Sequence, residues 1–325
     1  MDSFNSKASK LMPSGQDERI SLRDHADYVS LTMEFRCNLR CVHCMIEGTM
    51  DRLEPQTDQK FEDILQEQRD SARWRGLILT GSEITLRRDL PQLASRAREA
   101  GFERVRIQTH GARLARHAYS DRLIEAGVNE FFVSVAGSDR ESHDRIVDVR
   151  GSWDKMLAGL EYLDSIEDVR LITNTVVTDL SYRLLPDLVE NLRHLKKLVQ
   201  MEFWTYWPMA ETDEKQLCAR HVEVLPFLVL AVRRARNFGR FVEVKNFPHC
   251  LLAGVGLSDA LVNDQPLLLI DPSFWKEFAR NGFDQCVHRR SCGSRQCLGI
   301  NTAYADRFGW ETDVLKPMPD TEKSG

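Results

Sequence analysis

Seven short apolar runs recur between residues 28 and 247, and segments of helical periodicity separate them. In the segment 57–72, for example, Phe61, Ile64 and Leu65 form one apolar helical stripe. Near-continuous apolar strands that alternate with helices are typical of a parallel sheet covered on both faces. The pattern predicts an α/β fold, a partial (β/α)6-type TIM-like barrel with a small irregular C-terminal domain. The predicted strands span residues 28–34, 76–80, 105–109, 131–135, 169–177, 198–206 and 241–245.

Composition divides the chain into three predicted parts. Residues 1–27 are polar and mixed in charge, which indicates a loose N-terminal arm. Residues 28–247 carry the strand and helix alternation and form the predicted barrel. Residues 248–325 lose that alternation and are rich in Cys, Gly and Arg, so we expect a small irregular domain that is held together by something other than a hydrophobic core.

The charge and hydropathy of the chain exclude two classes of partner. A net charge of -5 argues against a protein that binds the phosphate backbone of nucleic acid. The first 20 residues lack the apolar segment of a secretion signal. The longest apolar run, 222–232, contains Glu223 and Pro226 and is too short to span a bilayer. We therefore expect a cytoplasmic protein with neither nucleic acid nor membrane as a partner.

The chain has eight cysteines, which in a reducing compartment are not expected to form disulfides, so metal ligation or redox chemistry is the leading explanation. Three of them, Cys37, Cys41 and Cys44, follow the first predicted strand in a Cys-x3-Cys-x2-Cys spacing. A structural zinc site needs four ligands, and His43 is the nearby candidate for a fourth. Three thiolates on a cubic iron-sulfur cluster would instead leave one iron open, and an open iron is a binding site.

This spacing, on the loop after the first strand, resembles the signature of the radical S-adenosylmethionine (radical SAM) superfamily. The family has a Gly-Gly-Glu-Pro-like turn after strand two, and this chain has Thr80-Gly81-Ser82-Glu83-Ile84-Thr85 there. The family's Thr-Asn-Gly-like turn after strand three is matched by Thr109-His110-Gly111. The resemblance covers roughly residues 28–245 and implies a 4Fe-4S cluster that binds S-adenosylmethionine, whose reductive cleavage gives a 5'-deoxyadenosyl radical.

The same resemblance implies a set of cofactor-binding residues on the loops and strand ends. The turn after strand two would meet the methionine amino group through its backbone and the Glu83 side chain, although Ser82 and Ile84 depart from the family pattern. Ser134 and Asn174 fall where the family contacts ribose or the methionine carboxylate. The alternative is that both are buried polar residues of the strands whose side chains bond to the backbone. His43 would pack near adenine. The complete expected set is His43, Thr80, Gly81, Ser82, Glu83, Gln108, Ser134 and Asn174.

Four further cysteines gather in the last quarter of the chain, with Cys286-x5-Cys292-x4-Cys297 preceded by Cys250. An all-cysteine set of four suits a structural zinc as well as an iron-sulfur cluster. The segment resembles the SPASM or twitch extensions that follow many radical SAM barrels, although its spacings differ from the usual ones. That resemblance implies an auxiliary 4Fe-4S cluster.

If both cysteine sets bind clusters, Cys218 is left over, in the segment after the sixth strand. A thiol S–H bond is weaker than a sugar or peptide C–H bond, so a thiol can give its hydrogen to a carbon radical. The family's epimerases use such a cysteine, which makes Cys218 the candidate catalytic hydrogen donor. The alternative is a small apolar residue on a stripe with Leu217 and Val222.

The end of the sixth strand suggests the substrate class. Trp204, Tyr206 and Trp207 offer rings that can stack on sugars, and the acids Glu211, Asp213 and Glu214 follow. Core packing and surface solvation explain the same residues equally well.

These features favour a radical SAM epimerase of a carbohydrate or aminoglycoside-type natural product. Such an enzyme takes electrons from an external one-electron reductant of the flavodoxin or ferredoxin type. The enzyme alternatives are a radical SAM dehydrogenase of a sugar or aminocyclitol and a maturase that modifies a ribosomal peptide. The non-enzyme alternative is a zinc-stabilised binding module.

Overall fold

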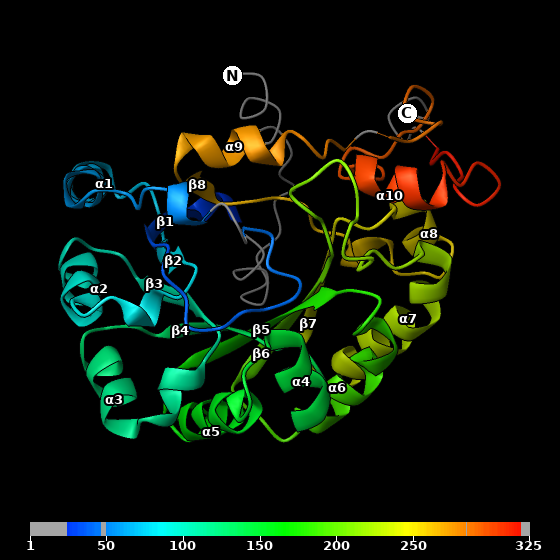
Figure 1. Ribbon diagram of the computed structural model, residues 1–325. Coiled ribbons are helices and arrows are strands. Elements are labelled where there is room, and N and C mark those ends of the chain that lie inside the picture. The colour runs from blue at the N-terminus through cyan, green and yellow to red at the C-terminus, as the bar shows by residue number, and fades with distance from the viewer. Residues whose placement is uncertain (1–24, 47–49, 284, 320–325) are drawn as a thin grey trace.

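The computed structural model describes residues 25–46, 50–283 and 285–319. Over these residues the strands form one eight-stranded sheet in the order β7-β6-β5-β4-β3-β2-β1-β8, and every neighbouring pair is parallel. The sheet curls into a half-barrel, as Figure 1 shows, so the partial-barrel fold is confirmed. The strands are β1 (Tyr28–Glu34), β2 (Gly76–Gly81), β3 (Arg104–Thr109), β4 (Glu130–Ser134), β5 (Arg170–Val177), β6 (Leu198–Thr205), β7 (Phe241–Lys245) and β8 (Leu267–Leu269).

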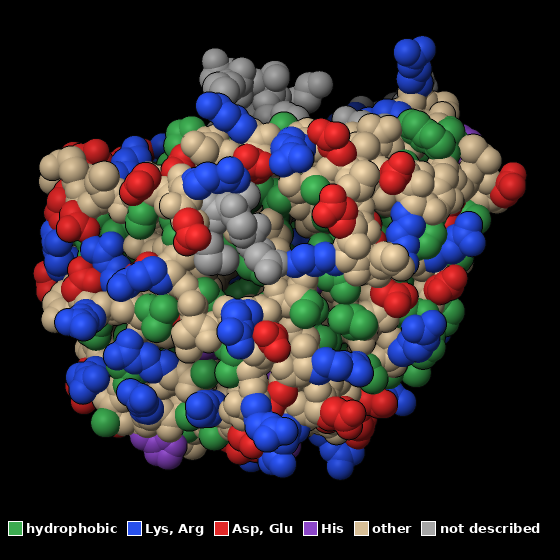
Figure 2. All heavy atoms as spheres, in the orientation of Figure 1, with side chains coloured by type: hydrophobic (Ala, Val, Ile, Leu, Met, Phe, Trp, Pro, Cys, Tyr) green, Lys and Arg blue, Asp and Glu red, His purple; other side chains and the backbone are tan. Residues whose placement is uncertain are grey.

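Helices follow the strands and surround the convex side of the sheet (Figure 1). The α-helices are α1 (Asp58–Ser71), α2 (Leu90–Glu99), α3 (His117–Glu125), α4 (Arg140–Val147), α5 (Ser152–Asp164), α6 (Leu185–Asn191), α7 (His221–Asn237), α8 (His249–Ala253), α9 (Pro272–Phe278) and α10 (Thr302–Phe308). None of the helices in the described part of the chain is long and apolar enough to cross a bilayer. On the face shown in Figure 2, acidic and basic side chains are interspersed.

The strands carry different side chains on their two faces. In β1, Val29, Leu31 and Met33 belong to the main apolar core, while the alternate residues Ser30 and Thr32 are also buried but polar. Since successive side chains of a strand point to opposite faces, the apolar set meets the helices and the polar set faces the concave side. The sequence analysis expected a parallel sheet covered on both faces and curled into a barrel. In the curled sheet the concave face carries buried polar residues beside apolar ones such as Phe132 and Ile172.

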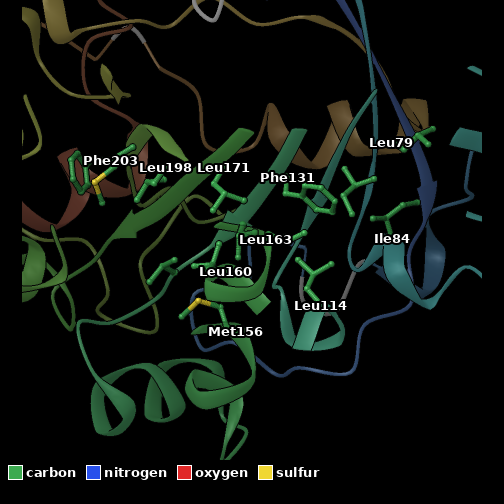
Figure 3. Close-up of a cluster of buried hydrophobic side chains, with 14 of the residues drawn as sticks. Leu79, Ile84, Leu114, Phe131, Met156, Leu160, Leu163, Leu171, Leu198 and Phe203 are labelled. Carbon is green, nitrogen blue, oxygen red and sulfur yellow. The ribbon is translucent and has the colours of Figure 1, made fainter. Parts of the chain in front are cut away.

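The core between sheet and helices is built from large aliphatic and aromatic side chains. In Figure 3, Met156 and Leu160 of α5 point toward the sheet, where Phe131 and Leu171 come from β4 and β5. All four side chains are fully buried. Their burial removes apolar surface from water on both elements and fixes α5 against the strands, so the strand ends that carry polar residues rest on a rigid base.

The C-terminal quarter of the chain returns to the barrel. β8 pairs with β1, with Val29 opposite Leu267 and Leu31 opposite Leu269. Helices α8, α9 and α10 also lie in this quarter, which the sequence analysis expected to be irregular. The boundary predicted at residue 247 stays a prediction, and the first 24 residues of the predicted arm lie outside the described residues.

Candidate functional site

The candidate site lies where the first strands end, because the loops after parallel strands meet at one edge of the barrel. The cysteine loop follows β1, and two backbone hydrogen bonds fix it: Arg40 N–H to the Val147 carbonyl at 3.1 Å and Val42 N–H to the Ile146 carbonyl at 2.9 Å. These acceptors belong to the last turn of α4. The loop is thus tied to an element that follows β4, although it comes directly after β1.

The three thiols of this loop are half-buried and suit an iron-sulfur cluster. Cys37 Sγ accepts a hydrogen bond from the Leu39 N–H at 3.4 Å, and such N–H donors to sulfur are typical of cluster ligands. Burial raises the pKa of the Cys37 thiol, and negative charge on Glu83 and Cys44 raises it further. Cys37 and Cys41 pack against the same small cluster of buried residues. Bound iron would lower the pKa of the Cys37 thiol by stabilising the thiolate.

The turn after β2 lies against the end of β1. A Cβ on Gly81 would stand 1.9 Å from the Glu34 carbonyl oxygen, so only glycine fits there. The Ser82 N–H donates to the same carbonyl at 2.8 Å. Ser82 Oγ is buried and has no hydrogen-bond partner among the described residues. The turn therefore presents backbone and one unsatisfied hydroxyl beside the cysteine loop, which suits a polar ligand at the cluster.

Glu83, expected to meet S-adenosylmethionine through its side chain, has its carboxylate fully engaged inside the protein. Its Oε1 accepts from Thr85 N–H at 2.9 Å, Thr85 Oγ1 at 2.5 Å and Thr109 Oγ1 at 2.7 Å. Its Oε2 accepts from the backbone N–H of His110 at 2.9 Å and lies 3.1 Å from His110 Nε2. His110 Nε2 also lies 2.9 Å from Oδ1 of Asn38 in the cysteine loop. Glu83 therefore joins the turns after β2 and β3 directly and the cysteine loop through His110. Its role as a contact of S-adenosylmethionine stays a prediction.

The other expected cofactor residues fall on the concave face. Thr80 Oγ1 donates to Gln108 Oε1 at 2.6 Å, which links β2 to β3. Ser134 of β4 stands opposite Asn174 of β5 in the sheet register. The side chain of Ser134 is exposed, so burial with backbone satisfaction does not describe it, while Asn174 is buried. Their roles as cofactor contacts stay predictions.

His43 lies between two of the cysteines, and its Nδ1 is buried without a hydrogen-bond partner in the described part of the chain. Burial lowers the pKa of His43 to about 4, and the charges of His143 and Lys215 act in the same direction. The imidazole is therefore neutral at pH 7. A neutral ring can stack on an adenine base, which keeps the expected role as a prediction.

Backbone and packing contacts bring the C-terminal cysteines toward one another. The N–H of His249, the neighbour of Cys250, donates to Cys297 Sγ at 3.5 Å, and Cys250 and Cys286 pack against the same buried cluster. Burial raises the pKa of the Cys250 thiol, and the charges of Cys297, Cys286 and Cys292 raise it further. Cys250 belongs to α8, and the other three lie on loops before α10. The fold thus brings Cys250 toward cysteines that lie more than 30 residues later in the sequence, as a four-cysteine site requires.

Backbone N–H groups surround these sulfurs. Cys297 Sγ accepts from the N–H of His249 at 3.5 Å and of Gly299 at 3.4 Å, and Cys292 Sγ accepts from Met318 N–H at 3.3 Å. Such donors stabilise negative charge on thiolates and tune the potential of iron-sulfur clusters. Across residues 25–46, 50–283 and 285–319, no three His, Cys, Asp or Glu side chains converge closely enough for a single metal ion. A cubane is larger than one ion and holds its cysteine sulfurs further apart.

Cys218 is buried in a small apolar cluster, with an exposed fraction of 2%. Its backbone N–H donates to Asp213 Oδ2 at 2.8 Å, and Arg307 Nη1 pairs with the same oxygen at 2.6 Å. Burial, followed by the charge of Asp213, raises the pKa of the Cys218 thiol well above its usual value. Cys218 is therefore a protonated thiol, as both the hydrogen-donor role and the packing role require. The cluster comprises Tyr206, Leu217, Cys218, Ile300, Tyr304 and Leu315.

The aromatic residues expected to stack on a sugar separate into two groups. Tyr206 and Trp207 are buried, and Trp207 Nε1 donates to the Asn281 carbonyl at 2.9 Å, so both serve packing. Trp204 is half-buried, and its Nε1 donates to Glu202 at 2.8 Å. The sequence analysis missed Gln200 and Glu202, although polar residues at every second position of an apolar strand are a readable signal.

The site combines a parallel half-barrel, a three-cysteine loop after β1 and the Gly81–Ser82 turn after β2. Together these features define a class of enzyme that binds an iron-sulfur cluster where the barrel strands end. The Radical SAM superfamily model matches residues 33–177. The matched segment runs from the end of β1 to the end of β5 and includes the cysteine loop and the turn after β2, so this part of the chain is similar to the radical SAM superfamily. The match supports a 4Fe-4S cluster and S-adenosylmethionine as cofactors.

The curated relatives that match this chain are named for different reactions. The probable GTP 3',8-cyclase of Methanopyrus kandleri is 32% identical over 170 residues, which cover 52% of this chain and 54% of that protein. The Fe-coproporphyrin III synthase of Methanosarcina barkeri is 33% identical over 138 residues, which cover 42% of this chain and 34% of that protein. The chain thus spans about half the length, or less, of these curated relatives.

Solved structures share the fold. The crystal structure of SuiB from Streptococcus suis bound to S-adenosylmethionine matches with a TM-score of 0.53 at 16% identity, over 68% of this chain and 51% of SuiB. Native anSMEcpe with bound AdoMet and the Kp18Cys peptide matches with a TM-score of 0.53 at 15% identity, over 67% of this chain and 63% of that one.

Proposed function

We propose that this protein is a radical SAM enzyme that abstracts a hydrogen atom from its substrate. The arrangement of Cys37, Cys41 and Cys44 on the loop after β1, beside the glycine turn after β2, carries the proposal. When bound, the cluster and S-adenosylmethionine supply a 5'-deoxyadenosyl radical that removes a substrate hydrogen. The three thiolates would hold such a cluster and would leave one iron without a protein ligand, where the cofactor could bind.

The residues around the loop hold and orient that cofactor. The Gly81–Ser82 backbone and the unpartnered Ser82 Oγ suit the methionine amino group. Gln108, Ser134 and Asn174 face the same concave space and suit ribose or carboxylate oxygens. The barrel shields the reacting groups from water, which protects a radical from side reactions.

Cys250, Cys286, Cys292 and Cys297 hold an auxiliary 4Fe-4S cluster in this proposal. Their mutual proximity and the N–H donors to Cys292 and Cys297 support it. An external one-electron reductant of the flavodoxin or ferredoxin type supplies the electrons.

The reaction proposed is epimerisation of a carbohydrate or aminocyclitol. Cys218 donates its S–H hydrogen atom to the substrate carbon radical, on the face opposite abstraction, and so inverts the centre. The S–H bond breaks, a C–H bond forms and a thiyl radical remains on Cys218. One electron from the external reductant and one proton from water restore the thiol. The buried, protonated state of Cys218 supports this role.

Anaerobic reconstitution followed by an assay for 5'-deoxyadenosine tests the proposed activity. The wild-type protein is expected to bind iron and sulfide and to release 5'-deoxyadenosine from S-adenosylmethionine with a strong reductant. Cys41→Ala is expected to abolish release. Release that persists in this variant would reject the proposal.

A further inference from the structure

A row of polar side chains crosses the concave face of the sheet. Asn174 of β5 stands opposite Glu202 of β6, and Glu202 stands opposite Glu243 of β7. The neighbours of Glu202 along the strand, Met201 and Phe203, belong to the apolar core on the other face. Glu202 and Glu243 are therefore a pair of buried carboxylates on the concave side, at the level of the expected cofactor contacts.

Within the described residues, Glu243 is the member of this pair that forms ion pairs. Glu243 Oε2 lies 3.0 Å from Lys245 Nζ and 3.0 Å from His25 Nε2. Lys245 Nζ also donates to the Val262 carbonyl at 3.0 Å, so its position is fixed. These contacts commit Lys245 and His25 to Glu243. The buried Arg106 of β3, whose charge also interacts with Glu202, is ion-paired with Glu130 at 2.9 Å.

Glu202 has hydrogen bonds but no ion pair in the described part of the chain. Gln200 Nε2 donates to its Oε1 at 2.8 Å and Trp204 Nε1 donates to its Oε2 at 2.8 Å, and both donors are neutral. Its exposed fraction is 2%. A buried carboxylate without a cation is strongly unfavourable. Burial and then the charge of Glu243 raise the pKa of Glu202, which reports the same imbalance.

A second acceptor beside Glu202 also lacks a partner. Gln200 is fully buried, and its Oε1 accepts no hydrogen bond within the described residues. Because Gln200 Nε2 bonds to Glu202, this oxygen lies within one carboxamide group of the carboxylate. The two side chains thus offer a hydrogen-bond acceptor that lacks a donor and a carboxylate that lacks an ion-pair partner in the described part of the chain. An ammonium group supplies both a donor and a charge, because it has three N–H donors and one positive charge.

We propose that Glu202 and Gln200, with the indole of Trp204, form the recognition site for an amino group of the substrate. This inference rests on the proposed function and narrows it to amine-bearing polyols, such as amino sugars or aminocyclitols. The ammonium group donates to the Glu202 carboxylate and to Gln200 Oε1. The half-buried ring of Trp204 contacts the apolar face of the sugar or the cation.

Equilibrium binding measured by calorimetry tests this site without any radical chemistry. Glucosamine and glucose serve as probes because they differ by one amino group. The wild-type full chain is expected to bind glucosamine more tightly than glucose. In Glu202→Gln the preference is expected to fall by about tenfold or more, because a charged hydrogen bond is lost. The exposed Glu125→Gln, on the C-terminal turn of α3, is the matched control and is expected to bind as wild type.

Each other outcome overturns the site. Equal binding of the two sugars, absence of glucosamine binding, or an unchanged preference in Glu202→Gln would reject it. Gln200→Leu provides a second variant that keeps the carboxylate, and it is expected to weaken the preference severalfold. A parallel assay of 5'-deoxyadenosine release separates the two proposals. If the protein releases 5'-deoxyadenosine but binds both sugars equally, the amine site alone is rejected. If it prefers glucosamine but releases no 5'-deoxyadenosine, the radical function alone is rejected.

Discussion

The Glu83 carboxylate accepts a hydrogen bond from the backbone N–H of His110 at 2.9 Å, across 27 residues of sequence. The contact joins the turn after β2 to the turn after β3. Through Asn38, the His110 ring extends the same network to the cysteine loop. The positions of three separate loops thus depend on one buried carboxylate.

Glu83→Gln is expected to destabilise the fold and to loosen the cysteine loop. Both carboxylate oxygens accept from N–H or O–H donors, so either orientation of the amide places its NH2 group against a donor. The expected loss in the free energy of unfolding is about 2 kcal/mol, as for a buried unsatisfied polar group. Urea unfolding of the protein without iron measures it. Glu125→Gln should change stability by no more than about 0.5 kcal/mol; an equal effect of the two variants would contradict the network.

The two cysteine sets are expected to lose iron independently. The double variant Cys286→Ala/Cys292→Ala should bind about four fewer iron atoms per chain than wild type and keep the absorption of the first cluster. The variant Cys37→Ala/Cys41→Ala should lose about four others. Iron and sulfide analysis after anaerobic reconstitution checks both. Zinc in place of iron at the second set would overturn the auxiliary cluster.

Turnover in deuterated water is expected to place one deuterium at the inverted carbon, because the Cys218 thiol exchanges with solvent. Cys218→Ser keeps the volume of the side chain, but its O–H bond is too strong to give hydrogen to a carbon radical. This variant should still release 5'-deoxyadenosine while the epimer disappears. Mass spectrometry of the product decides, and product two hydrogens lighter or without deuterium would favour dehydrogenation.

The barrel was predictable because its signal is local. Strand β1 was predicted at residues 28–34 and is found there, since each long strand carries its own apolar run between helices. Strand β8 was missed because three half-buried residues are too few to show a period. It exists through its pairing with β1, a contact across more than 200 residues that no local pattern reports.

The candidate site, too, was predictable only where its sequence signal is local. The Cys37, Cys41 and Cys44 spacing is contained within eight positions, so the sequence was sufficient to find it. For Trp207 the sequence left stacking and core packing open, because its partner, the Asn281 carbonyl, lies 74 residues away. The alternation of Gln200 and Glu202 along β6 is a local signal, but the pairing of Glu202 with Glu243 depends on the register of β6 with β7 and could not be predicted from it.

The final prediction concerns acid stability and the same pair of strands. Burial alone would raise the pKa of Glu243, but hydrogen bonds and charge from His25 and Lys245 outweigh it and lower the pKa from 4.5 to about 2. A lowered pKa in the folded state stabilises the fold above the unfolded value and loses that contribution as the pH falls. Wild type should therefore lose stability between about pH 4.5 and pH 2 more steeply than Glu243→Gln, which lacks the titrating group. Urea midpoints across this range measure the difference, and parallel curves for the two proteins would show that the ion pairs of Glu243 do not stabilise the barrel.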